Sequence, residues 1–189
     1  MRTLGSESER RASTLATRRS EIAPCSVVFN AVGKRFTVRY TRSEGRSLEI
    51  AQRSPSDLAL SGDTGNQKGC LILLRWWLQA QGRLHLVPWL ERLGHETGLS
   101  FRTAQIRRQK TRWGSCSSRG TISLNCKLLF LPPKLVRYIM LHELCHTVHL
   151  NHSAEFWAFL AAIEPLCRAL DAEMKHSGRF VPQWAGGPL

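Results

Sequence analysis

The stretch from Leu141 to Trp157, LHELCHTVHLNHSAEFW, contains four histidines and two glutamates in an otherwise apolar context. On a helix, His142 and His146 are one turn apart on the same face, so both imidazoles can reach one metal ion. Glu143 follows the first histidine, where its carboxylate can reach a water at the metal rather than the metal itself. This H-E-x-x-H pattern predicts a metal centre with a general base.

A catalytic zinc usually has three protein ligands, so a third ligand is needed. If the helix continued to His149, that residue would lie roughly 10.5 Å along the axis from His142, too far to share one ion. Asn151 can adopt the left-handed conformation that ends a helix, which would let the chain return and bring His152 to the metal. We therefore favour His152. Glu155 stays an alternative, although the start of a following helix would itself stabilise a carboxylate there.

A helix with ordinary core histidines is the competing interpretation of this stretch. Three buried imidazoles and a carboxylate would then lack partners, which is costly in a low-dielectric interior. We therefore expect a metal cofactor. We assign it as Zn2+ from the ligand type, although imidazole sites also accept other transition metals.

The segments before this motif predict a small sheet and a helical region. Residues 1–26 are rich in Arg, Ser, Thr and Glu without hydrophobic periodicity, which indicates a disordered basic tail. RFTVRYT and SLEIAQ alternate apolar and polar residues and predict a hairpin over 35–52. Residues 54–69 are typical of a loop. Helical spacing begins at Cys70 and continues to about Thr97, with Gly82 and Pro88 expected to kink or divide the helix.

The segments around and after the motif alternate between strand and helix patterns. Phe101–Gln109 and TISLN (121–125) are predicted strands, separated by the turn RWGSCSSRG. Pro132 and Pro133 are expected to begin a helix that continues to about His149. Ser153 should cap one further helix over 153–170, and 176–189 should form a loose tail.

Length and composition favour one domain, over residues 27–175, and its mixture of strand and helix patterns predicts the α+β class. The chain has 189 residues with 42% hydrophobic content, enough for one core. Six cysteines without a C-x-x-C pair or an apolar leader favour reduced thiols and a cytoplasmic protein, with a Cys116–Cys126 disulfide as the alternative. The longest apolar stretch, 70–78, is too short for a membrane span and is interrupted by Arg75.

Two separated segments, RWGSCSSRGTISLN and LPPKLVRYIMLHELCHTVHLNHSAEFW, resemble the YgjP-like metallopeptidase domain family. The resemblance extends closely over residues 101–165. It implies a zincin-like fold, a small β-sheet packed on helices that include the H-E-x-x-H helix. It also implies His142, His146 and His152 as metal ligands and Glu143 as catalytic base.

The resemblance is weaker before residue 101. Family members usually have a longer sheet region there, so we expect a reduced substrate-facing wall built from 35–52 alone. Position 145 is Cys where the family more often has Ala. On the helix, this small thiol should point away from the His142–His146 face.

We therefore expect a zinc-dependent metallopeptidase in which Glu143 takes a proton from water and passes it to the leaving amine. Candidates for stabilising the oxyanion are Arg112, Lys110, Tyr138 and His149. If TISLN is an edge strand it could align a peptide substrate, with Ser123 and Asn125 on its two faces. It could equally be an internal strand. Trp113 and Trp157 are expected in the core.

Two other functions compete with this hypothesis. The formal charge of +13 and a basic run would suit a DNA-associated protease similar to the SprT-like enzymes, although an Arg-rich composition alone could explain the charge. The run consists of Arg102, Arg107, Arg108, Lys110 and Arg112. A non-catalytic zinc-binding module with a basic partner surface is the other alternative. Glu143 argues against it, because a structural zinc site needs no base.

Overall fold

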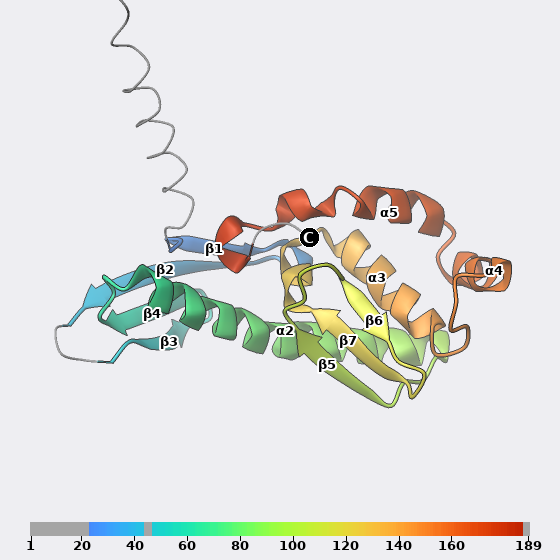
Figure 1. Ribbon diagram of the computed structural model, residues 1–189, viewed down its shortest axis with the longest axis horizontal. Coiled ribbons are helices and arrows are strands. Elements are labelled where there is room, and N and C mark those ends of the chain that lie inside the picture. The colour runs from blue at the N-terminus through green and yellow to red at the C-terminus, as the bar shows by residue number, and fades with distance from the viewer. Residues whose placement is uncertain (1–22, 44–46, 187–189) are drawn as a thin grey trace, which may run out of the picture.

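The computed structural model describes residues 23–43 and 47–186, which form two small sheets and four helices (Figure 1). The α+β class and the small size of the sheets are as predicted, but there are two sheets rather than one. The strands are β1 Ser26–Phe29, β2 Lys34–Arg42, β3 Glu49–Ser54, β4 Asp57–Gly62, β5 Thr103–Arg107, β6 Gly114–Cys116 and β7 Thr121–Asn125. The helices are α2 Gln67–Thr97, α3 Pro133–Cys145, α4 Ala154–Ile163 and α5 Cys167–Met174, with short 3-10 helices η2 Asn30–Val32, η3 Cys126–Phe130, η4 Ser177–Phe180 and η5 Gln183–Ala185.

The first sheet has the strand order β1-β2-β4-β3, so the predicted hairpin between 35–41 and 47–52 is wrong. Strand β4 lies between them, parallel to β2 and antiparallel to β3. The loop expected over 54–69 in fact contains β4. Its Leu58 and Leu60 are fully buried, and removing two leucines from water at the centre of a sheet is worth several kcal/mol, at about 1.5–3 kcal/mol each.

The first sheet is also larger than the sequence suggested. Residues 1–22 of the expected tail lie outside the described residues, but Ala23 is buried and β1 begins at Ser26. Strand β1 pairs antiparallel with β2 and buries Val27 and Phe29. The expectation of a sheet reduced to 35–52 is therefore wrong.

Helix α2 is continuous from Gln67 to Thr97, so of the kink or division predicted at Gly82 and Pro88, the division is wrong. A Cβ on Gly82 would lie 2.8 Å from the side chain of Ile106, which shows that this glycine allows close approach of α2 to β5. Leu86 and Leu90 on either side of Pro88 are fully buried, and this packing holds the helix together across the proline. At 1.5 Å per residue the helix is roughly 46 Å long, and it runs from the first sheet to the second (Figure 1).

The second sheet has the order β5-β7-β6. The strand predicted at 121–125 is confirmed, but it is the central strand and not an edge. RWGSCSSRG is only partly a turn, since Gly114–Cys116 forms strand β6 along one side of β7. The edges of this sheet are therefore β5 and β6.

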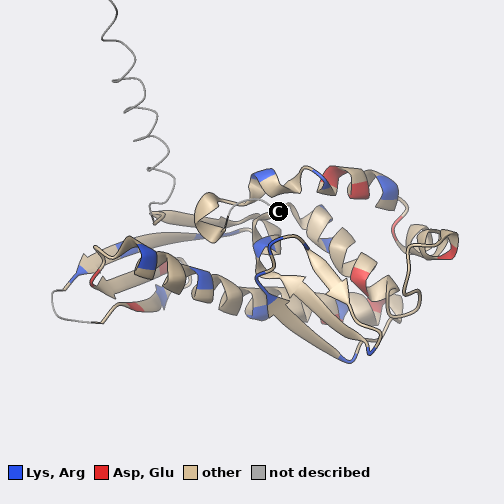
Figure 2. Ribbon diagram, viewed as in Figure 1, with Lys and Arg blue, Asp and Glu red and all other residues tan. Residues whose placement is uncertain are grey.

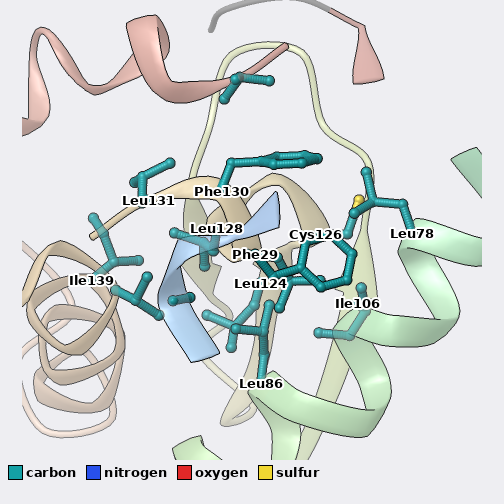
Figure 3. Packing of buried hydrophobic residues seen from close by; sticks show 14 of the residues in the cluster. Phe29, Leu78, Leu86, Ile106, Leu124, Cys126, Leu128, Phe130, Leu131 and Ile139 are labelled. Carbon is teal, nitrogen blue, oxygen red and sulfur yellow. The ribbon is translucent and has the colours of Figure 1, made fainter. Parts of the chain in front are cut away.

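One apolar core joins the two sheets through α2 (Figure 3). Phe29 from β1 stacks on Trp77 of α2 with ring centroids 5.4 Å apart, and it meets Phe130 of η3 edge to face. Ile106 and Leu124 bring β5 and β7 into the same cluster. The second sheet is thus fixed against α2, and α3 packs against both β6 and β7.

The C-terminal region differs from the prediction in two ways. The helix expected over 153–170 is interrupted between α4 and α5, because Pro165 has no N–H to donate and disfavours helical backbone at Glu164. The loose tail expected over 176–189 is wrong for residues 176–186. Trp184 is buried there, and its carbonyl accepts a 2.7 Å hydrogen bond from Nε of Arg75.

All six cysteines lie in the described residues and are free, so the alternative Cys116–Cys126 disulfide is not formed. Among the described residues, no helix is both long and apolar enough to cross a membrane.

Candidate metal centre

Helix α3 presents the two histidines of the motif and then ends sooner than predicted. Pro133 lies in its first turn as expected, but the last helical residue is Cys145 rather than His149. The amide of Thr147 donates to the carbonyl of Leu144 at 2.9 Å, and the Thr147 hydroxyl donates to the same oxygen at 2.7 Å. This tightened last turn lets the chain reverse before α4 begins.

The reversal brings the Nε2 atoms of His142, His146 and His152 together. They lie 2.9 Å apart for His142 and His152, and 3.2 Å apart for each of the other two pairs. A tetrahedral metal with ligands at 2.0–2.1 Å places its ligand atoms roughly 3.3–3.4 Å apart. The three nitrogens are therefore close to the spacing that one ion requires, and they form a group suited to a metal.

His149 and Glu155, the other two candidate ligands, lie outside this group. The His149 ring packs edge to face on Phe159, with centroids 5.3 Å apart. Its backbone carbonyl instead lies 2.8 Å from Nδ1 of His146, which fixes that ring with Nε2 toward the cluster. Glu155 is exposed, and a hydrogen bond with Ser153 is the main cause that lowers the pKa of its carboxyl group.

Tyr138 lies behind His142 and away from the converging nitrogens. Its hydroxyl is 3.5 Å from Nδ1 of His142 and donates a 2.9 Å hydrogen bond to Asp171 of α5. The side chain is buried, and burial followed by the bond to Asp171 raises the pKa of the phenol. Tyr138 therefore supports the back of a histidine. An oxyanion contact would have to face the centre, and Tyr138 does not. Asp171 was not identified from the sequence, because it belongs to a helix that packs on α3 only in the folded chain.

Phe156 forms the apolar floor of the cluster. Its ring stacks on His146 at 4.6 Å and meets His142 and His152 edge to face at 5.0 Å and 4.9 Å. It is fully buried in the first turn of α4. The ring excludes water from beneath the three imidazoles and restricts their rotation.

Glu143 is 5% exposed, and its Oε2 is buried without a hydrogen-bond partner. Burial raises the pKa of this carboxyl group to about 8, while the charge of Arg112 lowers it. The backbone of β6 passes directly beside the carboxylate, since a Cβ on Gly114 would lie 2.5 Å from Oε1. The glycine of RWGSCS is thus required by the position of Glu143.

These observations fit a bound cation. Burial and the neighbouring His146 and His152 lower the pKa of His142 to about 4, so its imidazole is neutral and able to act as a ligand near pH 7. A buried carboxylate oxygen without a partner beside three converging imidazoles is costly unless a positive charge is present.

The remaining candidates from the sequence have different positions. Arg112 and Lys110 are exposed, and Arg112 is close enough to Glu143 to act on its pKa. Asn125 is completely buried and donates to the carbonyls of Gln109 and Arg112 at 3.0 Å and 2.8 Å. The proposal that Asn125 contacts substrate is therefore wrong, because it fixes the loop before β6 instead.

Ser123, the other candidate on the TISLN strand, lies in the middle of the second sheet. It pairs with Gln105 of β5 on one side and Ser115 of β6 on the other. Because both edges of its strand are occupied, a peptide cannot add to the sheet there.

The two tryptophans near the site are half-buried rather than central to the core. The carbonyl of Trp113 accepts a 2.8 Å hydrogen bond from the amide of Asn125, which continues the support of the loop before β6. Trp157 lies beside the cluster, with its ring 6.1 Å from that of His152 and 6.3 Å from that of His142.

Three converging imidazoles, an H-E-x-x-H helix and a buried glutamate beside an edge strand define the class of metal-dependent hydrolases. The sequence model of the family described as "YgjP-like, metallopeptidase domain" matches residues 8–177. The chain belongs to this family, as its motifs indicated. The family supports metal-dependent peptidase activity in general.

A solved structure also resembles the chain. It is the metallopeptidase zymogen abylysin of Pyrococcus abyssi, with 25% sequence identity and a TM-score of 0.43. The similarity covers 47% of this chain and 90% of that one. The search of curated proteins found no match.

Proposed function

We propose that the protein is a zinc-dependent peptidase in which His142, His146 and His152 hold the metal and Glu143 is the general base. The observation that carries the proposal is the convergence of three Nε2 atoms, 2.9–3.2 Å apart, beside a buried carboxylate without a hydrogen-bond partner. Three imidazoles leave a fourth position open, as catalytic zinc sites do.

When bound, the zinc supplies Lewis-acid activation of water and of the scissile carbonyl. Around it, the chain fixes the ligands from behind. The His149 carbonyl orients His146, and the Tyr138 hydroxyl with Asp171 supports His142. Phe156 keeps water away from beneath the three rings. Such supporting contacts hold histidine ligands in the tautomer that leaves Nε2 free.

Glu143 moves the proton in this mechanism. Its Oε2 has no competing hydrogen bond, so it is free to accept a proton from the attacking water and to deliver it to the leaving amine. In the metal-free fold burial raises the pKa of this carboxyl group, and a bound cation would lower it again. Both forms are therefore accessible, the carboxylate for the first transfer and the acid for the second. Arg112, whose charge acts on Glu143, is the candidate group for stabilising negative charge that develops on the substrate.

Strand β6 takes the place of TISLN as the surface for the peptide. It pairs with β7 on one edge, and no other described strand pairs with its outer edge. Gly114 of β6 lies against Glu143, so a peptide added along this strand would pass beside the general base. Main-chain pairing would hold the substrate extended without requiring a particular sequence.

Chelation and rescue test the proposal. Purified protein should cleave unstructured protein such as casein, lose the activity when zinc is chelated, and regain it with stoichiometric zinc. Glu143→Gln should retain zinc and lose turnover by several orders of magnitude. Full activity in zinc-free protein or in Glu143→Gln would refute it.

A DNA-associated protease is the second candidate, and the placement of the basic run favours it. All five of its members are exposed, and none forms an ion pair with an acidic residue of the described chain. Figure 2 shows basic residues on α2 and around the second sheet. Single-stranded or duplex DNA should then stimulate cleavage at low salt, and lose this effect as salt is raised. An unchanged rate would remove this candidate.

A further inference from the structure

A positive charge is fixed beside the proposed metal centre by an aromatic ring. The guanidinium carbon of Arg168, at the start of α5, lies 3.7 Å from the centroid of the Trp157 ring. Trp157 in turn lies within 6.3 Å of the rings of His142 and His152, measured between centroids. Stacking on an aromatic face restrains a guanidinium while its N–H groups, which lie in its plane, still point outward.

Arg168 has no anionic partner within the described chain. Residues 23–43 and 47–186 give it no hydrogen bond and no ion pair, and its side chain is exposed to solvent. The two carboxylates within helical reach have other partners. Glu164 pairs with Arg137, and Asp171 accepts the hydrogen bond from Tyr138. The donors of Arg168 are thus available to a ligand from solution.

Helical geometry places Arg168 across the centre from strand β6. Tyr138 and Glu143 are five residues apart, which is roughly 140° around helix α3. Glu143 faces β6, whereas Tyr138 faces Asp171 on α5, one turn from Arg168. Figure 1 shows α3 between β6 on one side and α5 on the other. The histidines lie between these two sides. A peptide held along β6 would therefore have β6 on one flank and Trp157 with Arg168 on the other.

We propose that Arg168, stacked on Trp157, forms a carboxylate-binding subsite that selects peptides with a negative group close to the scissile bond. The proposal rests on the proposed peptidase function and adds the substrate class. A carboxylate can accept two parallel N–H bonds from a guanidinium, which a neutral amide of the same shape cannot. This carboxylate is that of an Asp or Glu side chain or that of the free C-terminus of the substrate.

Paired peptide pools distinguish these sources. One random pool contains Asp and Glu, the second has Asn and Gln at the same positions, and each is made with free and with amidated C-termini. Zinc-loaded protein should cleave the pool that carries the preferred carboxylate with a kcat/KM on the order of tenfold higher than that for the matched neutral pool, mainly because KM is lower. Preference for the Asp and Glu pool in both terminal forms identifies a side chain as the ligand. Preference for free over amidated termini identifies the C-terminus.

Three variants assign the preference to Arg168. Arg168→Gln should remove it, and Arg168→Lys should retain only part of it, because lysine lacks the planar pair of donors. Arg179→Gln is the matched control. It removes the same charge from another exposed arginine stacked on an aromatic ring, Phe180, which makes no ring contact with the histidines. It should keep the preference.

A binding measurement separates failure of this inference from failure of the proposed function. The zinc-loaded Glu143→Gln variant, immobilised on a solid support, should retain from the pools the peptides that carry the preferred carboxylate. The double variant with Arg168→Gln should show no such enrichment. The double variant with Arg179→Gln should show the same enrichment as Glu143→Gln alone. No cleavage of any pool would refute the peptidase function, but the binding result would still decide the subsite. Equal cleavage or binding of all pools, or a preference that survives Arg168→Gln, would overturn the inference.

Discussion

The two sides of helix α3 support the histidine cluster in different ways. On the β6 side the contact is steric, since the backbone at Gly114 leaves no room for even a methyl group beside Glu143. On the α5 side the contact is polar and indirect, from His142 through the Tyr138 hydroxyl to Asp171. We infer that the β6 side fixes the carboxylate of Glu143, whereas the α5 side adjusts the affinity of the histidines for a metal.

The largest effect should come from filling the space beside the carboxylate. Gly114→Ala places a Cβ 2.5 Å from Oε1 of Glu143, so the carboxyl group must move. We expect kcat/KM to fall about a thousandfold, within the range for loss of a positioned base. Zinc content should stay near that of wild type.

Gly65→Ala is the matched control, because the nearest atom to its added Cβ is a side-chain oxygen of Asp63 at 3.4 Å. It should keep wild-type activity. Wild-type activity in Gly114→Ala as well would show that the β6 side does not fix Glu143.

The burial of Glu143 should also make the free energy of unfolding of the zinc-free protein depend on pH. Its folded-state pKa is raised from 4.5 to about 8 by burial, so the protonated form is the stable one in the metal-free fold. This stability is fully present below about pH 4.5 and is lost as pH rises through about 8. Glu143→Gln has no such loss, and near pH 9 it should exceed wild type by about 5 kcal/mol in free energy of unfolding, because a pKa difference of about 3.5 corresponds to about 1.4 kcal/mol for each unit.

Denaturant titrations of both metal-free proteins, at pH values from 4.5 to 9, measure this difference. It should grow with pH and level off above about pH 8. If the difference in free energy of unfolding were constant over this pH range, the carboxylate would be solvated. That result would contradict the close packing of β6 against Glu143.

The smallest effect should come from the α5 side. Tyr138→Phe keeps the buried ring but removes the hydroxyl between His142 and Asp171. Loss of such a supporting contact typically weakens metal binding 10- to 100-fold, and we expect the lower value because the His142 contact is long at 3.5 Å. Competition with a zinc chelator measures the affinity. If activity fell strongly in zinc-saturated Tyr138→Phe, the two sides would not have separate roles.

The elements that could be predicted from sequence are those whose signal is local. The spacing of His142 and His146 and the alternation in TISLN are such signals, and the structure contains the helix and the strand. The chain reversal was also predicted, but for an incomplete reason. It was expected from a left-handed Asn151 after a helix that reaches about His149, whereas the helix ends at Cys145 and is followed by the tight turn at Thr147.

What could not be predicted depends on contacts between distant segments. Leu58 and Leu60 look like a short apolar interruption in a loop until β2 and β3 lie on both sides of them. Gly82 resembles a helix breaker until Ile106 is seen packed against it. Asp171 is 33 residues from the tyrosine it supports, and no periodicity links them.

Zinc content per chain, measured by elemental analysis on wild type, His152→Ala and His149→Ala, tests the metal centre most directly. Wild type should contain close to one zinc. His152→Ala should lose most of it, because one of three converging Nε2 atoms is removed. His149→Ala should keep it, since only the backbone carbonyl of that residue contacts the cluster. Full zinc in His152→Ala, or its loss in His149→Ala, would contradict the three-histidine centre.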